Sequence, residues 1–265
     1  MGTMSSGRGE KERLRAEREA REQEATAAAT RRRRLGMLGG AILAAAAIVV
    51  ALILISSGGS SKGNGGSAGR PLEHVAEVNN LFKGIPQSGR VLGRSDAPVT
   101  MVEFADLQCP FCAQYAQDAL PTVVSRYVRA GKVKLELRLI AIIGPDSGKA
   151  RRMAAAAQRQ NRLWNFAELF YRNQGEENSG YVTDPFLRLV ASSVPSLDVN
   201  RAFSDRNGAA VQALLADNDA GAIARSVNST PTFFAGRSGQ SLAQLNPSSL
   251  DASGFTGPLD QLLKG

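Results

Sequence analysis

The chain of 265 residues is long enough for one or two ordinary domains, and its 43% hydrophobic content is typical of a globular protein. The net charge of +8 does not predict a nucleic-acid partner: residues 1–34 hold ten Lys and Arg against six Glu, a net of +4, and no basic stripe interleaved with aromatic residues follows. The chain has two cysteines, and both belong to one Cys-x-x-Cys unit, which excludes a small disulfide-stapled scaffold.

The first 55 residues predict a membrane anchor. Residues 1–34 are rich in Ala, Glu and Arg but have little to bury, so we expect a solvated helix or disorder, with a partner-binding coil as the alternative. Residues 35–55 are uncharged and apolar, and about 20 such residues are what a helix needs to cross the hydrocarbon core of a bilayer.

The charges beside this apolar run predict its orientation. Four arginines, residues 31–34, flank one end, whereas the other end is a neutral Ser/Gly segment. By the positive-inside rule, the segment before this cell-membrane anchor is then cytoplasmic, and the chain after it is extracytoplasmic. A cleaved signal peptide is the alternative, but the run is long and no small-x-small cleavage site ends it. We expect an uncleaved anchor, followed by a Gly/Ser-rich flexible linker at residues 56–70.

Residues 71–265 have the pattern of an α/β domain. Residues 91–92 favour a short strand, and residues 99–105 are a short apolar, β-branched run that predicts a buried strand. Residues 109–130 predict a helix in which Pro121 causes a kink or break. Residues 133–143 alternate and then become continuously apolar, which predicts another strand. Strand, helix and strand form a βαβ unit, so the two strands are expected to be parallel.

The second half of the domain is predicted to be largely helical. Residues 148–225 lack strand signals and have helical spacing, and we expect them to form an inserted helical subdomain. Phe233 and Phe234, after Pro231, predict a further strand, and residues 258–264 a closing helix.

Cys109 and Cys112 are placed for redox chemistry. They follow a predicted strand directly and open a predicted helix, so Cys109 occupies the N-cap or first turn and Pro110 a position where its missing N–H costs nothing. Free backbone N–H groups and the helix dipole stabilise a thiolate there. Cys112 lies one turn along on the same face, behind Cys109. We therefore expect Cys109 to be the exposed sulfur that attacks or is attacked, and Cys112 the resolving sulfur of a redox-active disulfide.

Three other uses of the cysteine pair are less consistent with the sequence. A zinc site needs about four ligands, and the chain offers two cysteines and His74. A c-type haem attachment needs His after the second cysteine, where Ala113 stands. A purely structural disulfide three residues apart closes a very small loop and stabilises little. No metal and no cofactor are expected.

Residues 96–112, DAPVTMVEFADLQCPFC, resemble the active-site region of the DsbA-like thiol–disulfide oxidoreductases, which have a thioredoxin fold with a helical insertion. Residues 229–234, STPTFF, resemble that family's second landmark, a Thr before a cis proline. The resemblance covers roughly residues 90–240 and is strongest at these two motifs. It implies a thioredoxin-like α/β fold with an inserted helical subdomain, preceded here by the predicted transmembrane helix.

The resemblance also implies roles for individual residues. Pro231, if cis, lays its strand beside the sulfurs, and Thr230 offers backbone groups to an extended substrate, with Pro110 and Phe111 completing the substrate-binding surface. Glu103, six residues before Cys109, is expected beneath Cys112 and to exchange protons with it, helped by a pKa raised through burial.

Some assignments stay open at this point. A half-exposed strand position is the alternative for Glu103, and Asp106 is a competing acid. The most oxidising members of the family have His where Phe111 stands, and Phe can neither donate a hydrogen bond nor supply positive charge. We therefore expect a Cys109 pKa above the value of about 3.5 known for DsbA and a less oxidising couple. His74, before the core of the domain, is expected at the surface.

The leading hypothesis is an enzyme that oxidises thiols of secreted or surface proteins and is itself reoxidised by a membrane redox partner. A disulfide reductase or isomerase would use the same sulfurs in the other direction, and sequence does not fix that direction. A non-enzymatic tethered module that binds a thiophilic metal such as Cu(I) is a rival of another class, although no further Met or His lies near Cys109. A structural or scaffold role is a third.

Overall fold

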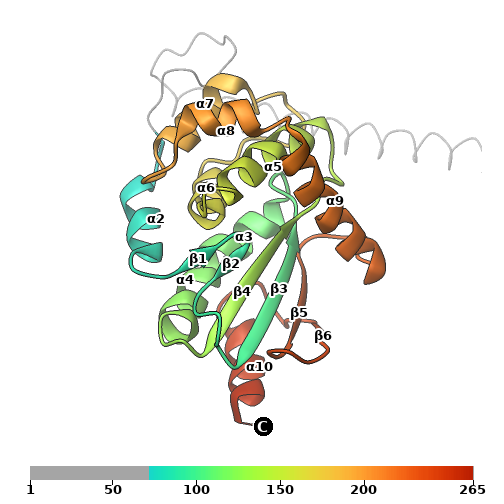
Figure 1. Ribbon diagram of the computed structural model, residues 1–265. Helices are drawn as coiled ribbons and strands as arrows, with labels where there is room; N and C mark the ends of the chain where they lie inside the picture. The colour runs from blue at the N-terminus through green and yellow to red at the C-terminus, as the bar shows by residue number, and fades with distance from the viewer. Residues whose placement is uncertain (1–71, 265) are drawn as a thin grey trace, which may run out of the picture. The chain divides into compact units, whose positions relative to one another are not determined.

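A computed structural model describes residues 72–264 (Figure 1). In chain order its elements are α2 (Val75–Phe82), β1 (Gln87–Ser88), β2 (Val91–Leu92), β3 (Val99–Ala105), α3 (Pro110–Asp118), α4 (Leu120–Val123), the π-helical turn η1 (Val124–Val128), β4 (Val133–Leu139), α5 (Pro145–Gln158), α6 (Leu163–Arg172), α7 (Asp184–Ser192), α8 (Val199–Asp205), α9 (Ala209–Ala224), β5 (Thr232–Arg237), β6 (Ala243–Leu245) and α10 (Ser253–Lys264).

A six-stranded mixed sheet organises the domain. The strand order is β1-β2-β4-β3-β5-β6, and the central β3 runs parallel to β4 and antiparallel to β5. The parallel pair confirms the βαβ unit predicted from the sequence. Because β3 lies between two neighbours and is buried along almost its whole length, its carboxyl end is held at a fixed position in the domain.

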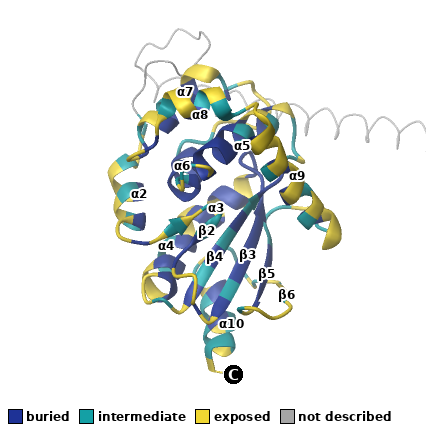
Figure 2. Ribbon diagram, in the orientation of Figure 1, coloured by how far each residue is buried: buried dark blue, intermediate teal, exposed yellow. Residues whose placement is uncertain are grey.

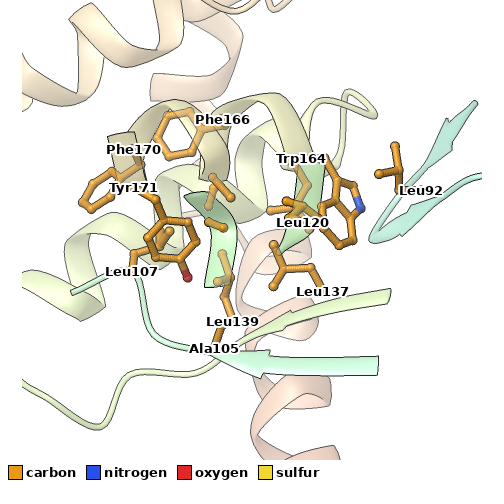
Figure 3. Close-up of a cluster of buried hydrophobic side chains, with 14 of the residues drawn as sticks. Leu92, Ala105, Leu107, Leu120, Leu137, Leu139, Trp164, Phe166, Phe170 and Tyr171 are labelled. Carbon is orange, nitrogen blue, oxygen red and sulfur yellow. The ribbon is translucent and has the colours of Figure 1, made fainter. Parts of the chain in front are cut away.

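The larger part of the core lies on the face of the sheet that carries α3, α4 and α6. Figure 2 shows most of β3 and β5 and the inner faces of these helices as buried. Figure 3 shows Trp164, Phe166, Phe170 and Tyr171 of α6 gathered above side chains of the sheet, among them Leu137. A smaller cluster covers the other face, where Phe104 and Phe234 pack with their ring centroids 6.0 Å apart.

Helices α5 to α9 lie between β4 and β5 in the chain and form a layer above the carboxyl end of β3 (Figure 1). This is the region in which the sequence predicted helices. Helix α6 packs against α3, so the inserted layer contributes side chains directly above the start of α3.

The structure corrects two predicted boundaries. The strand expected at residues 133–143 ends at Leu139, because the Asp106 carboxylate accepts the N–H groups of Ile142 and Ile143 and turns that backbone into a loop. The closing helix begins at Ser253, where the Asp251 side chain accepts the Ser253 N–H, and Pro258 lies inside the helix. The predicted break near Pro121 is confirmed, since α3 ends at Asp118 and α4 begins at Leu120 with proline in its first turn.

The predicted anchor at residues 35–55, with its flanking segments, lies outside the described residues. Within residues 72–264, none of the helices has the length and apolar character needed to span a bilayer.

Candidate active site

Cys109 occupies the N-cap of α3, and Pro110 is the first residue of the helix. The Cys109 backbone is extended there, with φ −72° and ψ 120°, and its carbonyl accepts the Ala113 N–H at 3.1 Å. This is the position predicted from the sequence. One expectation was wrong: Cys109 is only 4% exposed, because the loop before β5 lies against its sulfur. Its Sγ lies 3.2 Å from the carbonyl oxygen of Thr230.

The surroundings of Cys109 stabilise its thiolate. The pKa of Cys109 is lowered from an ordinary 9.0 to about 6, and the hydrogen bond from the Cys112 thiol is the largest cause. The Thr230 side chain and the backbone N–H groups of Cys112 and Phe111 contribute to this lowering, and burial opposes it. A cysteine with this pKa is mostly thiolate at pH 7, which is the form that attacks disulfides.

Cys112 is fully buried, and its acidity changes in the opposite direction. Burial raises the pKa of the Cys112 thiol well above its ordinary value, and the hydrogen bond with Cys109 and the charge of Glu103 raise it further. The two cysteines are not joined by a disulfide in this structure. The reduced pair therefore holds one shared hydrogen bond, with the charge on Cys109 and the proton on Cys112.

Glu103 lies in β3 beneath the two sulfurs. It pairs with Leu137 and Phe233, so its side chain is on the face of the sheet that α3 covers, and it is 4% exposed. Burial raises the pKa of the Glu103 carboxyl well above its ordinary value, and the charges of Glu168 and Cys109 raise it further. The half-exposed alternative for Glu103 is thus wrong, and the expected pKa direction is confirmed.

The second predicted motif lies against the first. The Thr230–Pro231 peptide bond is cis, as the resemblance implied, and β5 begins at the next residue, Thr232. Thr230 and Pro231 are half-buried, whereas Pro110 and Phe111 are exposed, Phe111 by 59%. Residues 109–112 and 230–231, far apart in the sequence, therefore meet at one edge of the domain.

Comparison with known proteins agrees with this geometry. Residues 86–247 match the family model described as Thioredoxin, which is more than half of the chain. The chain belongs to the thioredoxin family.

The relatives of this thioredoxin-family chain support the DsbA-like resemblance. A probable disulfide bond formation protein D of Bacillus cereus is 35% identical over 113 residues, which are 42% of this chain and 52% of that protein. The chain spans about half the length of the curated relatives it matches. Crystal structures of oxidised BdbD from Bacillus subtilis (21% identity, TM-score 0.58, 68% of this chain and 98% of that one) and of Wolbachia pipientis α-DsbA1 (20%, 0.57, 71% and 96%) have the same fold. The predicted thioredoxin-like fold is confirmed.

Asp106, the competing candidate for the acid that exchanges protons with Cys112, instead binds backbone N–H groups. It is fully buried, and one carboxylate oxygen accepts the Gln108 N–H at 2.9 Å. The other accepts the N–H groups of Ile142 and Ile143, at 2.9 and 3.1 Å. Three backbone donors occupy this carboxylate, so Asp106 ties the loop before Cys109 to the loop after β4.

Side chains of the helical insertion donate hydrogen bonds to the backbone of the active-site loop, and these residues were not predicted from the sequence. Gln174 Nε2 donates to the carbonyls of Leu107 and Cys109, at 2.8 and 3.3 Å. The Tyr171 hydroxyl donates to the Asp106 carbonyl at 3.3 Å. These bonds hold the backbone that ends in the N-cap cysteine. Their donors lie more than 60 positions away in sequence, and no local pattern marks them.

Glu168 is a second buried carboxyl group that the sequence did not single out. It is 2% exposed in α6, and Arg172 Nε lies 3.0 Å from its Oε1. Burial raises the pKa of Glu168 to about 7, although Arg172 lowers it. One signal was present: Glu168 is the lone acidic residue in the apolar run at residues 163–171.

Two further expectations concern His74 and metals. His74 is exposed at the start of α2, and its Nδ1 lies 2.8 Å from Glu77 Oε2, which confirms its surface position. Among residues 72–264, no three His, Cys, Asp or Glu side chains are grouped in a way that would hold a metal ion.

Proposed function

We propose that this chain is a membrane-anchored, extracytoplasmic thiol–disulfide oxidoreductase that oxidises paired thiols of secreted or surface proteins. One observation carries the proposal: a cysteine with a lowered pKa caps α3, opposite the Thr230–Pro231 edge, and a buried cysteine with a raised pKa follows one turn later. The relatives named for disulfide bond formation support the same reading.

In the proposed reaction a substrate thiolate attacks Sγ of Cys109 in the oxidised enzyme. The Cys109–substrate bond forms as the Cys109–Cys112 bond breaks, and Cys112 leaves with the electron pair. Cys112 takes a proton from Glu103. A second substrate thiolate then attacks the substrate sulfur of the mixed disulfide and releases Cys109 as a thiolate. The substrate gains one disulfide and the enzyme gains two electrons; Glu103, left as a carboxylate, then regains a proton from solvent.

The stabilised Cys109 thiolate favours the oxidising direction. A reduced form that is stabilised by hydrogen bonds to its thiolate makes the disulfide a better oxidant. The pKa of about 6 lies above the value of about 3.5 for DsbA, in keeping with Phe111 in the motif. We therefore propose an oxidant milder than DsbA, for which no cofactor is needed.

Substrate binding is proposed at the edge where the two motifs meet. Phe111 and Pro110 present exposed apolar surface beside Cys109, and the backbone of Thr230 beside Pro231 offers strand-like pairing to an extended peptide. Since Cys109 itself is nearly buried, we expect flexible segments with accessible cysteines to react faster than folded ones.

Location and reoxidation are proposed from the sequence. The apolar run at residues 35–55 and the arginines at residues 31–34 support a single-pass anchor with a cytoplasmic N-terminus and an extracytoplasmic redox domain. Reoxidation of the reduced pair then requires a membrane redox partner. Appending a reporter that is active only in the cytoplasm to the C-terminus tests the topology, because reporter activity would contradict it.

The experiment that tests the activity is a redox titration of the full-length chain against glutathione, combined with trapping. Cys112→Ser should accumulate mixed disulfides with partner proteins through Cys109, and Cys109→Ser should accumulate none. If Cys112→Ser traps no partner, or if the two variants trap equally, the proposed mechanism is wrong.

A disulfide reductase or isomerase is the second candidate, because the same sulfurs serve either direction. The measured potential separates the candidates: a couple near that of thioredoxin, about −270 mV, would favour a reductase, one near about −180 mV an isomerase, and one near about −120 mV an oxidant. Metal analysis of the reduced protein tests the tethered metal-binding module, which requires bound metal at the thiol pair.

A further inference from the structure

Three buried polar groups in the packed elements β3, α3 and α6 each have an atom without a hydrogen-bond partner. They are Oε1 of Glu103 in β3, Oε2 of Glu168 in α6 and the hydroxyl of Tyr115 in α3. All three residues are at most 4% exposed. An unpartnered buried polar atom is costly, so each of these three groups needs a physical explanation.

These groups interact with one another. The charge of Glu168 raises the pKa of Glu103, and the charges of both glutamates raise the pKa of Tyr115. Helices α3 and α6 are packed together, and Glu103 faces α3 from the sheet. The three side chains thus belong to one buried polar layer that ends at Cys112, whose pKa is raised by Glu103.

A row of polar side chains connects Glu168 to the surface. Arg172 lies 3.0 Å from Glu168 and 3.1 Å from Glu77 of α2. Side-chain exposure rises along this row from 1% at Glu168 to 9% at Arg172 and 55% at Glu77. Glu168 is therefore the buried end of a polar path to solvent, whereas Glu103 has no ion pair of its own among the described residues.

We propose that Glu168 is a positioning residue that acts through Glu103, carrying the proton that Glu103 exchanges with solvent during disulfide exchange. This inference rests on the proposed function. When Cys112 leaves as a thiolate, it takes the Glu103 proton, and Glu103 is left as a carboxylate. Glu168 in its acid form then gives its proton to Glu103. Glu168 regains a proton from solvent on the side where Arg172 and Glu77 lie.

The electrostatics favour this inward direction. Arg172 of α6 lowers the pKa of Glu168 and Glu77 of α2 raises it, and Glu103 of β3 and Tyr115 of α3 are coupled to it electrostatically. With a pKa of about 7, Glu168 is present in both forms near neutrality. Its negative charge holds the proton on Glu103, so protons are bound more strongly towards Cys112 than towards the surface.

The test uses the full-length oxidised chain mixed with excess dithiothreitol from pH 5 to pH 9, with the reaction quenched by acid and the freed thiols mass-tagged. The observed rate is divided by the dithiothreitol thiolate concentration at each pH. For the wild type, a plot of the logarithm of this rate constant against pH should show a break, a change of slope, near pH 7. Glu168→Gln should abolish this break and slow the reaction about tenfold below it, less than the loss of a proton donor in direct contact costs. Glu168→Asp should restore it.

Glu136→Gln is the matched control, because Glu136 is an ion-paired glutamate on the opposite face of the sheet, 2.7 Å from Arg138. The inference is overturned if Glu168→Gln keeps the break near pH 7, if Glu136→Gln removes it equally, or if Glu168→Asp behaves like the Gln variant. A wild-type chain that dithiothreitol does not reduce, or a Cys109→Ser chain that still exchanges disulfides, would instead refute the proposed function itself.

An infrared titration of the wild-type protein keeps the inference testable if Glu168→Gln does not fold. The carbonyl band of a protonated buried carboxyl group should lose intensity near pH 7 and should differ between the oxidised and reduced protein. A band that is insensitive to the redox state would contradict a role for Glu168 in exchange.

Discussion

The two ends of the first turn of α3 differ sharply although both carry cysteine. At the N-cap, Cys109 meets backbone N–H groups, the Cys112 thiol and Thr230, and its pKa falls to about 6. One turn later, Cys112 is enclosed by apolar side chains and lies above Glu103, and its pKa rises. The residue type is the same at both positions. The difference between them comes from the position in the helix and from what lies beneath it.

In the proposed reaction, this contrast lets one motif supply both an attacking and a resolving group. The reduced pair keeps its charge on Cys109, which lies against Thr230, and its proton on Cys112, which lies above Glu103. Variants on the Cys109 side and variants on the Cys112 and Glu103 side should therefore affect different steps of the reaction.

The largest expected effect is at the sulfurs themselves. Cys109→Ser should reduce the oxidation of a two-cysteine peptide to the uncatalysed rate, because the remaining buried thiol has a raised pKa and little access. Cys112→Ser should still attack an added disulfide but should stop at the mixed disulfide. Peptide oxidation followed by mass spectrometry measures both. Residual turnover in Cys109→Ser would contradict the division of roles.

Glu103→Gln should slow the step in which Cys112 leaves or attacks by about a hundredfold, the usual contribution of a positioned proton donor. Adding Glu103→Gln to Cys112→Ser should leave the rate at which Cys109 forms a mixed disulfide nearly unchanged, because Glu103 acts on the buried sulfur. Stopped-flow measurements of the two steps separate them. Asp106→Asn is a useful contrast, because its carboxylate binds backbone N–H groups and should affect stability more than rate.

The pH dependence of stability should reveal the cost of burying Glu168. Its pKa is raised from an ordinary 4.5 to about 7. The unfolded chain therefore loses this proton first as pH rises, so the contribution of Glu168 to stability is fully present below about pH 4.5 and is lost as pH rises through about 7. This corresponds to about 3 kcal/mol.

Glu168→Gln should lack this loss. Urea unfolding of the reduced protein measures the free energy of unfolding at pH 4 and at pH 8. From pH 4 to pH 8, this free energy should rise in the variant relative to the wild type by about 3 kcal/mol. A difference that stays constant with pH would mean that Glu168 is not held in its acid form by the fold.

The smallest expected effect comes from the residue between Pro110 and Cys112. Phe111→His places a partly charged ring beside the thiolate and should lower the Cys109 pKa from about 6 to about 5, with a more oxidising couple. Thiolate absorbance at 240 nm measures the pKa. Phe111→Tyr is the control and should leave it near 6. An unchanged pKa in Phe111→His would show that this position does not tune Cys109.

The sequence predicted the parts of the site that depend on local chemistry. The apolar run of β3, Pro110 at the start of α3 and the Thr230–Pro231 pair are local signals, and each was found where expected. Gln174 and Tyr171 were missed because their partners are brought together only by the fold. Helix α2 was missed as well, although it places Glu77 against Arg172.

The near-burial of Cys109 was also beyond the sequence, since it depends on how closely the Thr230 carbonyl approaches Sγ. Glu168 is the instructive case. A lone acid in an apolar helix is visible in the sequence, but its relation to Glu103 requires the packing of α6 on α3.

The central claim is that the two cysteines have opposite acidity, and alkylation of the reduced wild-type chain tests it most directly. Iodoacetamide would be added from pH 4 to pH 10, and peptide mass spectrometry would follow each site separately. We expect Cys109 to react with a midpoint near pH 6 and Cys112 to stay unmodified to pH 9. A shared midpoint near the free-thiol value of about 8.5, or earlier reaction of Cys112, would contradict the account.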